Sequence, residues 1–194
     1  MDPMLKLKKL EFVSLPKGDK LNLPKGTPIP HSTIVSHWEN RQKDMTPKDK
    51  ALIGLMNNSD LGLCSAFISG KGRGVVAKKE FDVDDFVIEY KGNLMTKKEG
   101  LLKEKEYSRM NISESYMFFF GENCIDATAE TKDLGRLINH SKKYANVEPL
   151  CVTLDGRPRL ALIASKKIRI NDEILFDYND NRKSAVENFP FLKE

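Results

Sequence analysis

Short apolar stretches, separated by polar and turn-forming residues, follow one another along the chain from about residue 61 onward. These stretches are rich in β-forming residues, a pattern typical of short strands. The predicted strands are 74–77, 86–90, 116–120, 123–128, 149–154, 159–164 and 174–178. Asp155-Gly156 stands between two of them and indicates a tight β-hairpin.

Two helices are indicated by capping residues at their starts. Thr46 can cap the first helix, with a proline in the first turn and Asp49 three residues on. Its expected apolar face is Ala51, Leu52, Leu55 and Met56. The second helix, 96–110, begins with Thr96 and Glu99 as a capping pair, and Lys and Glu dominate its exposed positions. Many short strands with one inserted helix predict an α+β, mainly β fold without repeats or βαβ units.

Residues 1–45 look like a basic segment outside the sheet system. Pro-Lys-Gly occurs at 16–18 and again at 24–26, and two more prolines follow. Residues 1–50 hold ten Lys or Arg against six Asp or Glu, whereas the rest of the chain holds 22 of each. This excess positive charge can attract nucleic acid or an acidic surface. A solvated tail that aids solubility is the alternative.

Composition and length limit the class of protein. A chain of 194 residues with 40% hydrophobic content suits one domain with an appendage. It has no apolar run near the ~20 residues that cross a bilayer, and its N-terminus lacks the apolar core of a secretory signal. Three widely separated cysteines, Cys64, Cys124 and Cys151, argue against a disulfide framework or zinc spacing, so a reduced intracellular compartment is expected.

Two short motifs suggest chemistry, but each has an ordinary explanation. The run Gly-Lys-Gly-Arg-Gly at 70–74 lacks P-loop spacing, and it precedes a strand, unlike a dinucleotide fingerprint. A tight turn is favoured there, although glycine lets the backbone approach a ligand closely. His140 beside Ser141 suggests a hydrolase, but neighbours on a strand point to opposite faces and no glycine elbow surrounds the serine.

Other polar aromatic and histidine residues are ambiguous when taken singly. Tyr90, Tyr116 and Tyr178 lie at or near strand ends, where each can be a core aromatic with a satisfied hydroxyl. The three histidines, at positions 31, 37 and 140, lack the spacing of metal ligands, so no metal site is expected.

Four motifs in a fixed order carry more information than any one of them. They are Gly-Lys-Gly-Arg-Gly-Val at 70–75, Glu-Tyr-Lys-Gly at 89–92, Arg-Leu-Ile-Asn-His-Ser at 136–141 and Glu-Ile-Leu-Phe-Asp-Tyr at 173–178. In this order they resemble the SET-domain protein lysine methyltransferases, and most closely the branch that acts on the lysine at position twenty of histone H4. The runs Cys-Ile-Asp-Ala-Thr at 124–128 and Asn-Phe-Pro-Phe-Leu-Lys at 188–193 also resemble that branch.

The resemblance covers about 46–194 and implies a fold of small curled sheets. In that fold the 174–178 strand passes beside the strand at 139–140 in a knot-like crossing near the C-terminus. The resemblance also divides the chain. The implied parts are a basic N-terminal segment at 1–45, a flanking helix at 46–60, the SET domain at 61–180 and a short post-SET segment at 181–194.

A methyl donor and its binding residues are also implied by the resemblance. S-adenosylmethionine is the expected cofactor and S-adenosylhomocysteine its product, while the target lysine enters a narrow channel from the opposite face. The implied cofactor-binding residues are Lys71, Gly72, Arg73, Tyr116, Asn139, His140 and Phe191. The implied catalytic residues are Tyr178, Tyr90 and Phe176, and the implied substrate-binding residues are Ser115 and Asp180.

Two residues depart from the pattern of the branch. Its monomethylating members have tyrosine at the position of Phe176, and the tyrosine hydroxyl holds a water that crowds a methylated amine. Because Phe176 lacks this hydroxyl, di- or trimethylation is expected. Phe191 stands where the branch often has tryptophan over the adenine, so its smaller stacking area predicts weaker cofactor binding.

The implied function is methyl transfer to a lysine of a histone tail. The expected partners are the histone H4 tail and the nucleosome, with DNA contact through the basic segment, no membrane, and a nuclear, chromosome-associated location. Two alternatives stay open: a methyltransferase of a non-histone protein, and an inactive SET-like module that binds chromatin. Retention of Tyr178, Asn139 and His140 argues against the inactive module.

Overall fold

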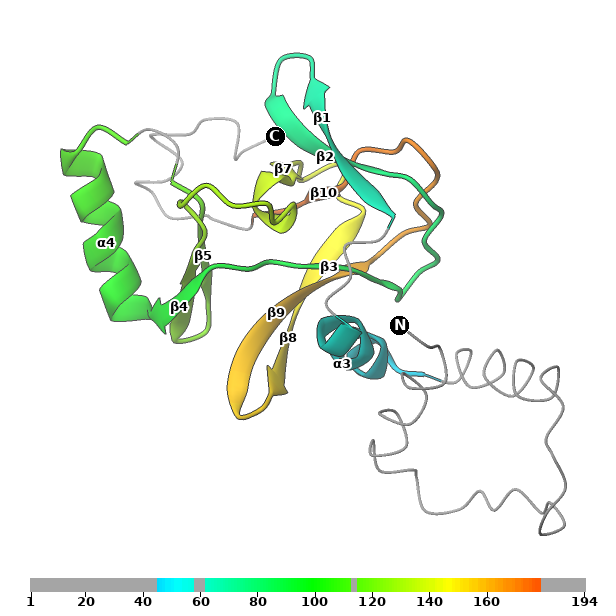
Figure 1. The fold of residues 1–194 in the computed structure, drawn as a ribbon, viewed down its shortest axis with the longest axis horizontal. Helices are drawn as coiled ribbons and strands as arrows, with labels where there is room; N and C mark the ends of the chain where they lie inside the picture. Colours follow the sequence, from blue (N-terminus) through cyan, green and yellow to red (C-terminus); the bar gives the residue numbers. More distant parts are fainter. Residues whose placement is uncertain (1–44, 58–61, 113–114, 179–194) are drawn as a thin grey trace, which may run out of the picture. The chain divides into compact units, whose positions relative to one another are not determined.

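The computed structural model describes residues 45–57, 62–112 and 115–178 of the chain (Figure 1). The chain is divided into two units, residues 1–44 and residues 45–194, and every described residue belongs to the second unit. Its strands form small sheets of two or three strands each. This arrangement confirms the prediction of a mainly β fold.

The described residues form two α-helices, one 3₁₀ helix and ten strands. The helices are α3 (Pro47–Asn57), α4 (Lys97–Arg109) and the 3₁₀ helix η1 (Gly135–Leu137). The strands are β1 (Leu63–Ile68), β2 (Gly72–Ala77), β3 (Phe86–Glu89), β4 (Asn93–Thr96), β5 (Met117–Phe120), β6 (Asn123–Asp126), β7 (Asn139–His140), β8 (Val147–Leu154), β9 (Arg157–Ala164) and β10 (Leu175–Phe176). In strand order the sheets are β1-β2, β3-β9-β8, β4-β6-β5 and β10-β7.

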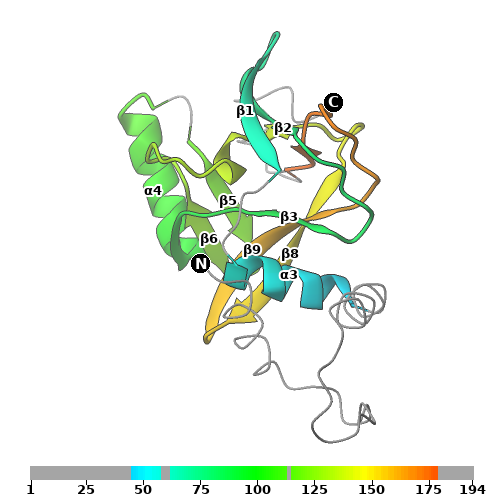
Figure 2. The ribbon, with the colours of Figure 1, turned by 45° about the vertical axis from the view of Figure 1, so that its right-hand side comes forward.

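Strand β9 is the middle strand of its sheet and is buried on both faces. Because side chains alternate along a strand, Leu160 and Leu162 belong to the main hydrophobic core. Ala161 and Ile163 belong to a second core together with Ala51 and Leu55 of α3, the helix that lies beside β8 and β9 in Figure 2. Full burial of a side chain such as Leu162 contributes about 1.5–3 kcal/mol. Strand β9 therefore contributes side chains to both hydrophobic cores.

Helix α3 is capped as its sequence predicts. The Thr46 backbone N–H donates to Asp49 Oδ2 at 3.2 Å, and the Asp49 N–H donates back to Thr46 Oγ1 at 3.2 Å. Ala51 and Leu55 are buried, but Met56 is 51% exposed, so the prediction that it joins the apolar face is wrong. Each helical residue adds a rotation of about 100°, which carries Met56 away from the stripe shared by Ala51 and Leu55.

The second helix and the hairpin are also confirmed. Thr96 and Glu99 form a reciprocal capping box at the start of α4. Asp155 and Gly156 have φ angles of 51° and 72° and connect β8 to β9. The sequence pattern does not single out β1 or β4. Strand β4 lies at a sheet edge with mostly exposed side chains, so it lacks the alternation that marks a half-buried strand.

Strand β10 is held by β7 and, through the residues just before it, by β2. It pairs with β7 in parallel over two residues. Asn146 supports this pairing, because its backbone N–H donates to the Leu175 carbonyl oxygen at 2.9 Å and its Oδ1 accepts from the Leu175 N–H at 2.9 Å. On the other side, the Ile174 N–H donates to the Val75 carbonyl oxygen at 2.8 Å. Motifs that are far apart in the sequence meet at this point.

Gly135, at the start of η1, occupies a position where a larger residue does not fit. A Cβ there would collide with the Glu89 carbonyl oxygen and lie 3.3 Å from Tyr90 Cα. We expect Gly135→Ala to lower the free energy of unfolding by about 1–3 kcal/mol, because backbone segments must move apart. Urea denaturation measures this loss. Lys132→Ala, an exposed change in the same loop, should cost less than about 0.5 kcal/mol; equal losses would contradict the steric explanation.

Candidate active site

Tyr178, which follows β10, is fixed by two hydrogen bonds to the β7 segment. Its hydroxyl donates to the Ile138 carbonyl oxygen at 2.8 Å, and its backbone N–H donates to His140 Nδ1 at 3.1 Å. The Tyr178 and His140 ring centroids lie 5.1 Å apart. The third and fourth sequence motifs therefore meet at Tyr178.

Four aromatic side chains form one group, which we call the aromatic cluster: Tyr90, Phe118, Phe176 and Tyr178. Phe176 stands at its centre. Its ring centroid lies 4.6 Å from that of Tyr178, 5.5 Å from that of Phe118 and 6.5 Å from that of Tyr90. Phe176 is 2% exposed and Tyr90 is 5% exposed, so this group is part of the protein interior. The three residues with an implied catalytic role thus lie together.

Phe118 is the cluster member that the sequence motifs do not identify. It lies on β5, with its ring centroid 5.2 Å from that of Tyr90 and its ring at 25° to the ring of Phe176. Tyr116, Phe118 and Phe120 alternate along one face of this segment, and all three pack against the main core. The signal in the sequence that points to Phe118 is its place two residues after Tyr116 in an aromatic-rich run, which puts both side chains on one face of a strand.

Burial controls the protonation of the two tyrosines in the cluster. Removal from water raises the pKa of Tyr90 and the pKa of Tyr178 well above their ordinary value of 10. Nearby phenols, Tyr178 for Tyr90 and Tyr116 for Tyr178, raise them further. At neutral pH both hydroxyls stay protonated, so they donate or accept hydrogen bonds but do not act as anionic bases.

The β1–β2 hairpin carries the glycine-rich turn and two cations. Gly72 has a φ of 82°, and a Cβ there would meet nothing within 4 Å, so the turn borders open space. Lys71 Nζ lies 2.9 Å from Glu173 Oε2. Arg73 donates two parallel bonds to Glu130, at 2.8 and 3.0 Å, which lower the pKa of Glu130 to about 2. Each cation therefore has a carboxylate partner from another segment.

Asn139 on β7 links this hairpin to the β10 segment. Its Nδ2 donates to Glu173 Oε1 at 2.9 Å and to the Arg73 carbonyl oxygen at 3.2 Å. The absence of a side chain at Gly74 permits this approach, because a Cβ there would lie 2.8 Å from Asn139 Nδ2 and 2.6 Å from Ile68 Cγ1. The hairpin motif and Asn139, both assigned to the cofactor by their resemblance, are thus in direct contact.

Tyr116 packs against a buried arginine. The Arg136 Cζ atom lies 4.1 Å from the Tyr116 ring centroid, and Arg136 is 3% exposed. Its guanidinium donates to two backbone carbonyl oxygens at 127–128, at 2.7 and 3.2 Å, and to Glu130 Oε2 at 3.0 Å. Because Glu130 also binds Arg73, a chain of charged contacts connects Tyr116 with the hairpin.

The remaining implied site residues are less well defined. Ser115 is half-buried and precedes Tyr116. Asp180 and Phe191 lie outside the described residues. Within the described ranges, no group of three or more His, Cys, Asp or Glu side chains could hold a metal ion. The same ranges contain no helix with the length and apolar character needed to cross a membrane.

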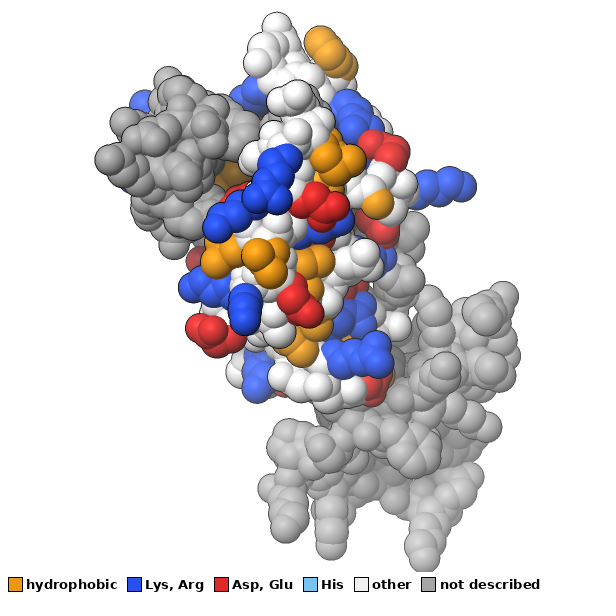
Figure 3. All heavy atoms as spheres, turned by 90° about the vertical axis from the view of Figure 1, so that its left-hand side faces the viewer, with side chains coloured by type: hydrophobic (Ala, Val, Ile, Leu, Met, Phe, Trp, Pro, Cys, Tyr) orange, Lys and Arg blue, Asp and Glu red, His pale blue; other side chains and the backbone are white. Residues whose placement is uncertain are grey.

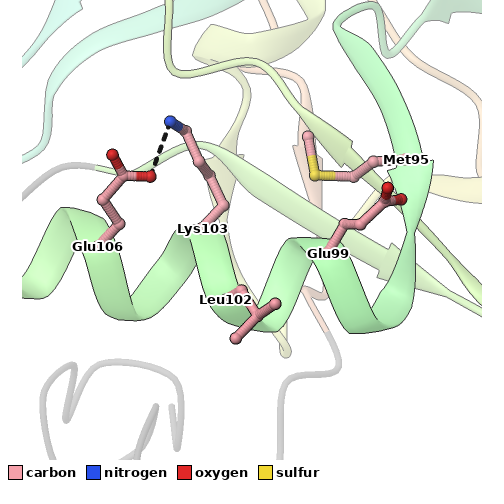
Figure 4. A pocket seen from close by; sticks show the side chains of 5 residues that line it. All are labelled: Met95, Glu99, Leu102, Lys103 and Glu106. Atoms are coloured by element: carbon pink, nitrogen blue, oxygen red, sulfur yellow. Dashed lines mark hydrogen bonds and ion pairs between the residues drawn. The ribbon is translucent and has the colours of Figure 1, made fainter.

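An open groove lies on α4, on a face where hydrophobic side chains are exposed among charged ones (Figure 3). The side chains that line it are Met95, Glu99, Leu102, Lys103 and Glu106 (Figure 4). An ion pair of 3.0 Å joins Lys103 and Glu106 at its edge. The groove includes no residue of the four motifs, so it is separate from the site described above.

The environment of His140 makes stability depend on pH. Its side chain is 4% exposed, and burial lowers its pKa below the ordinary 6.5, against a smaller opposite effect of Asp177. Because Nδ1 accepts the Tyr178 N–H, the folded protein holds the neutral ring. Below about pH 6.5 the unfolded chain therefore binds more protons at this residue than the folded chain does, which favours unfolding.

We expect the free energy of unfolding to fall as the pH decreases from about 7.5 to about 5.5, as measured by urea denaturation. In His140→Asn the amide oxygen can accept the same Tyr178 bond without titrating. The loss over this pH range should therefore be smaller in the variant. The same pH dependence in both proteins would show that His140 is not its source.

Comparisons with known proteins agree with the arrangement of the motifs. The profile of the SET domain family matches residues 72–179. N-lysine methyltransferase KMT5A of Xenopus tropicalis is 33% identical over 205 residues, which cover 93% of this chain and 61% of the relative. Histone-lysine N-methyltransferase Set8 of Drosophila melanogaster is 39% identical over 135 residues, which cover 68% of this chain and 19% of the relative.

A solved structure is similar as well. The crystal structure of CpSET8 from Cryptosporidium has a TM-score of 0.57 and 30% identity, and the match covers 83% of this chain and 71% of that chain. The chain spans 61% and 65% of the length of the two curated Xenopus relatives KMT5A and KMT5A-A. From the ordered motifs, the β7–β10 pairing and these matches, we conclude that the chain belongs to the SET-domain family.

Proposed function

We propose that this protein transfers methyl groups from S-adenosylmethionine to a lysine side chain of a histone tail, with histone H4 as the preferred substrate. SET-domain methyltransferases use S-adenosylmethionine as a family. The similar proteins are named N-lysine and histone-lysine methyltransferases, which supports this substrate class. The observation that carries the proposal is the aromatic cluster with the Tyr178 hydroxyl held beside β7, the strand that contacts the glycine-rich hairpin through Asn139.

The residues around the hairpin fit the amino-acid end of the methyl donor. The open space at Gly72 leaves room for a ligand against the backbone. Lys71 and Arg73 supply positive charge for a carboxylate, and Asn139 supplies an amide. When bound, S-adenosylmethionine supplies a methyl group on a positively charged sulfur. The residues proposed to hold it are Lys71, Gly72, Arg73, Tyr116, Asn139, His140 and Phe191.

The aromatic cluster can prepare a lysine amine for reaction. A free lysine amine has a pKa of about 10.4, so roughly one in several thousand is neutral at pH 7. Apolar rings that exclude water disfavour the ammonium form, and each unit by which the pKa falls is worth about 1.4 kcal/mol. The proton leaves to water before the amine is enclosed, so the cluster needs no general base.

Tyr178 and Tyr90 then orient the neutral amine. The Tyr178 O–H is already used as a donor to Ile138, so its oxygen is left to accept from an amine N–H. Tyr90 is proposed to offer its hydroxyl in the same way. Alignment of the amine in a narrow channel can remove several kcal/mol of the barrier. Ser115 and Asp180 are proposed to contact the substrate peptide.

The proposal extends to the rest of the chain. The SET domain at 61–180 would follow the flanking segment at 46–60, which contains α3, and precede a post-SET segment at 181–194. The basic segment 1–45 would contact nucleosomal DNA through its excess of Lys and Arg. The location that fits these partners is the nucleus, on chromatin.

Mass spectrometry of intact histones and of an H4 tail peptide, after incubation with the protein and S-adenosylmethionine, tests the activity. We expect methylated H4, and an activity lower by about 100- to 1,000-fold in Tyr178→Phe, because a positioned hydroxyl is lost. Tyr144→Phe, at a residue that is 64% exposed, should leave activity unchanged. If only non-histone peptides on an array are methylated, the substrate is a non-histone protein rather than histone H4. If no protein or peptide is methylated, the result would instead favour an inactive module that binds chromatin.

The product of the reaction is expected to exceed monomethyllysine. Phe176 is packed among Tyr178, Phe118 and Tyr90 without a hydroxyl that could anchor a water beside the amine. Phe176→Tyr should therefore shift the products of the H4 peptide toward monomethyllysine, as seen in the same mass spectra. Phe67→Tyr, a matched change at a residue that is 83% exposed, should leave the product distribution as it is. The prediction is wrong if the unchanged protein yields monomethyllysine and no higher product after the reaction has run to completion.

A further inference from the structure

We infer that Glu173 is a positioning residue for the amino-acid end of the methyl donor. It fixes the Asn139 amide so that the amide oxygen of Asn139 is left to accept a hydrogen bond from an ammonium group. The inference rests on the proposed function and concerns the same pocket. Neither the motifs nor the resemblance gives Glu173 a role in binding.

Glu173 is well suited to fix its neighbours, because both its backbone and its side chain are held. Its backbone forms an antiparallel bridge with Val76, and its carbonyl oxygen accepts from Asn146 Nδ2 at 2.8 Å. Its side chain is 18% exposed. Oε1 accepts from Asn139 Nδ2 at 2.9 Å, and Oε2 accepts from Lys71 Nζ at 2.9 Å. One carboxylate thus joins three segments of the chain.

The contacts of the Asn139 amide decide which way the amide faces. Its Nδ2 has two hydrogens, and two acceptors use them: Glu173 Oε1 and the Arg73 carbonyl oxygen, at 2.9 and 3.2 Å. A turn of the amide by 180° would place Oδ1 against two acceptor oxygens, which is unfavourable. The polar atom of the side chain that is left for a ligand is therefore Oδ1, an acceptor.

An acceptor at this position selects a donor from the ligand. The amino-acid end of S-adenosylmethionine and of S-adenosylhomocysteine carries an ammonium group, which is a strong donor. Without the Glu173 carboxylate, a single backbone acceptor would hold the Asn139 amide, so the amide could turn its nitrogen toward the ligand. Lys71 Nζ, 2.9 Å from Glu173 Oε2, offsets the repulsion between the Glu173 carboxylate and the ligand carboxylate.

Isothermal titration calorimetry with two ligands tests this role without relying on activity. S-adenosylhomocysteine carries the amino-acid end, whereas methylthioadenosine lacks it. We expect Glu173→Ala to weaken S-adenosylhomocysteine binding by about tenfold or more, the usual effect of a lost hydrogen bond to a charged group. Methylthioadenosine binding should change by less than about twofold, because its contacts do not include the Asn139 amide oxygen. A residue that merely supported the fold would affect both ligands.

Further variants separate the contributions. Glu173→Gln keeps an oxygen acceptor for Asn139 and should lose less affinity for S-adenosylhomocysteine than Glu173→Ala. If the alanine variant does not fold, the same comparison of the two ligands is made with Glu173→Gln. Lys71→Met removes the other partner of Glu173 together with a cation proposed for the ligand carboxylate, so it should weaken S-adenosylhomocysteine binding by itself, and adding Glu173→Ala to it should weaken binding further. Asp172→Asn alters the adjacent carboxylate, which accepts from the Arg169 N–H at 2.8 Å, and should leave both affinities unchanged.

Several results would overturn the inference. Equal S-adenosylhomocysteine affinity in the unchanged protein and in both Glu173 variants would do so, as would equal losses for the two ligands. Equal S-adenosylhomocysteine affinity in Lys71→Met and in the double variant with Glu173→Ala would assign the effect to the lysine instead. If the unchanged protein binds neither ligand, the proposed function fails together with this inference. If the unchanged protein and both Glu173 variants bind S-adenosylhomocysteine with equal affinity, only the inference about Glu173 fails.

Discussion

Two residues of parallel pairing between β7 and β10 bring Tyr178 next to His140, 38 positions away in the chain. So short a pairing is not stable in water by itself. It persists because Asn146 bonds Leu175 from one side, β2 bonds the preceding Ile174 from the other, and the Phe176 side chain is buried. The aromatic cluster, the contacts of Asn139 and the position of Tyr178 all depend on this crossing.

The site and the core are built from the same side chains. Tyr90 and Phe176 belong to the main hydrophobic core, and Phe118 and Tyr178 pack against it. Their burial stabilises the fold, and the same burial keeps the phenols protonated and would exclude water from an amine. By contrast, the ion pair of Arg73 with Glu130 is exposed and contributes little to stability. The hairpin side of the site can therefore adapt more easily than the aromatic side.

Features set by neighbouring residues could be predicted from the sequence. The caps at Thr46 and Thr96 and the hairpin at Asp155-Gly156 depend on residues at most three positions apart, and the structure contains them. The four motifs likewise predicted the family and which segments meet. The partners Glu173 and Glu130 were not predicted, because their contacts with Lys71 and Arg73 span 102 and 57 positions. Local pattern carries no information about such distant charge pairing.

The crossing also has a consequence for the time course of folding. The contacts of β10 with β7 and of Glu173 with β2 close long stretches of chain, so we expect them to form later than contacts between near neighbours. Helix α4 and the β8–β9 hairpin involve only near neighbours and can form quickly. The segment that carries Tyr178 is thus expected to be among the last parts of the domain to reach its final position.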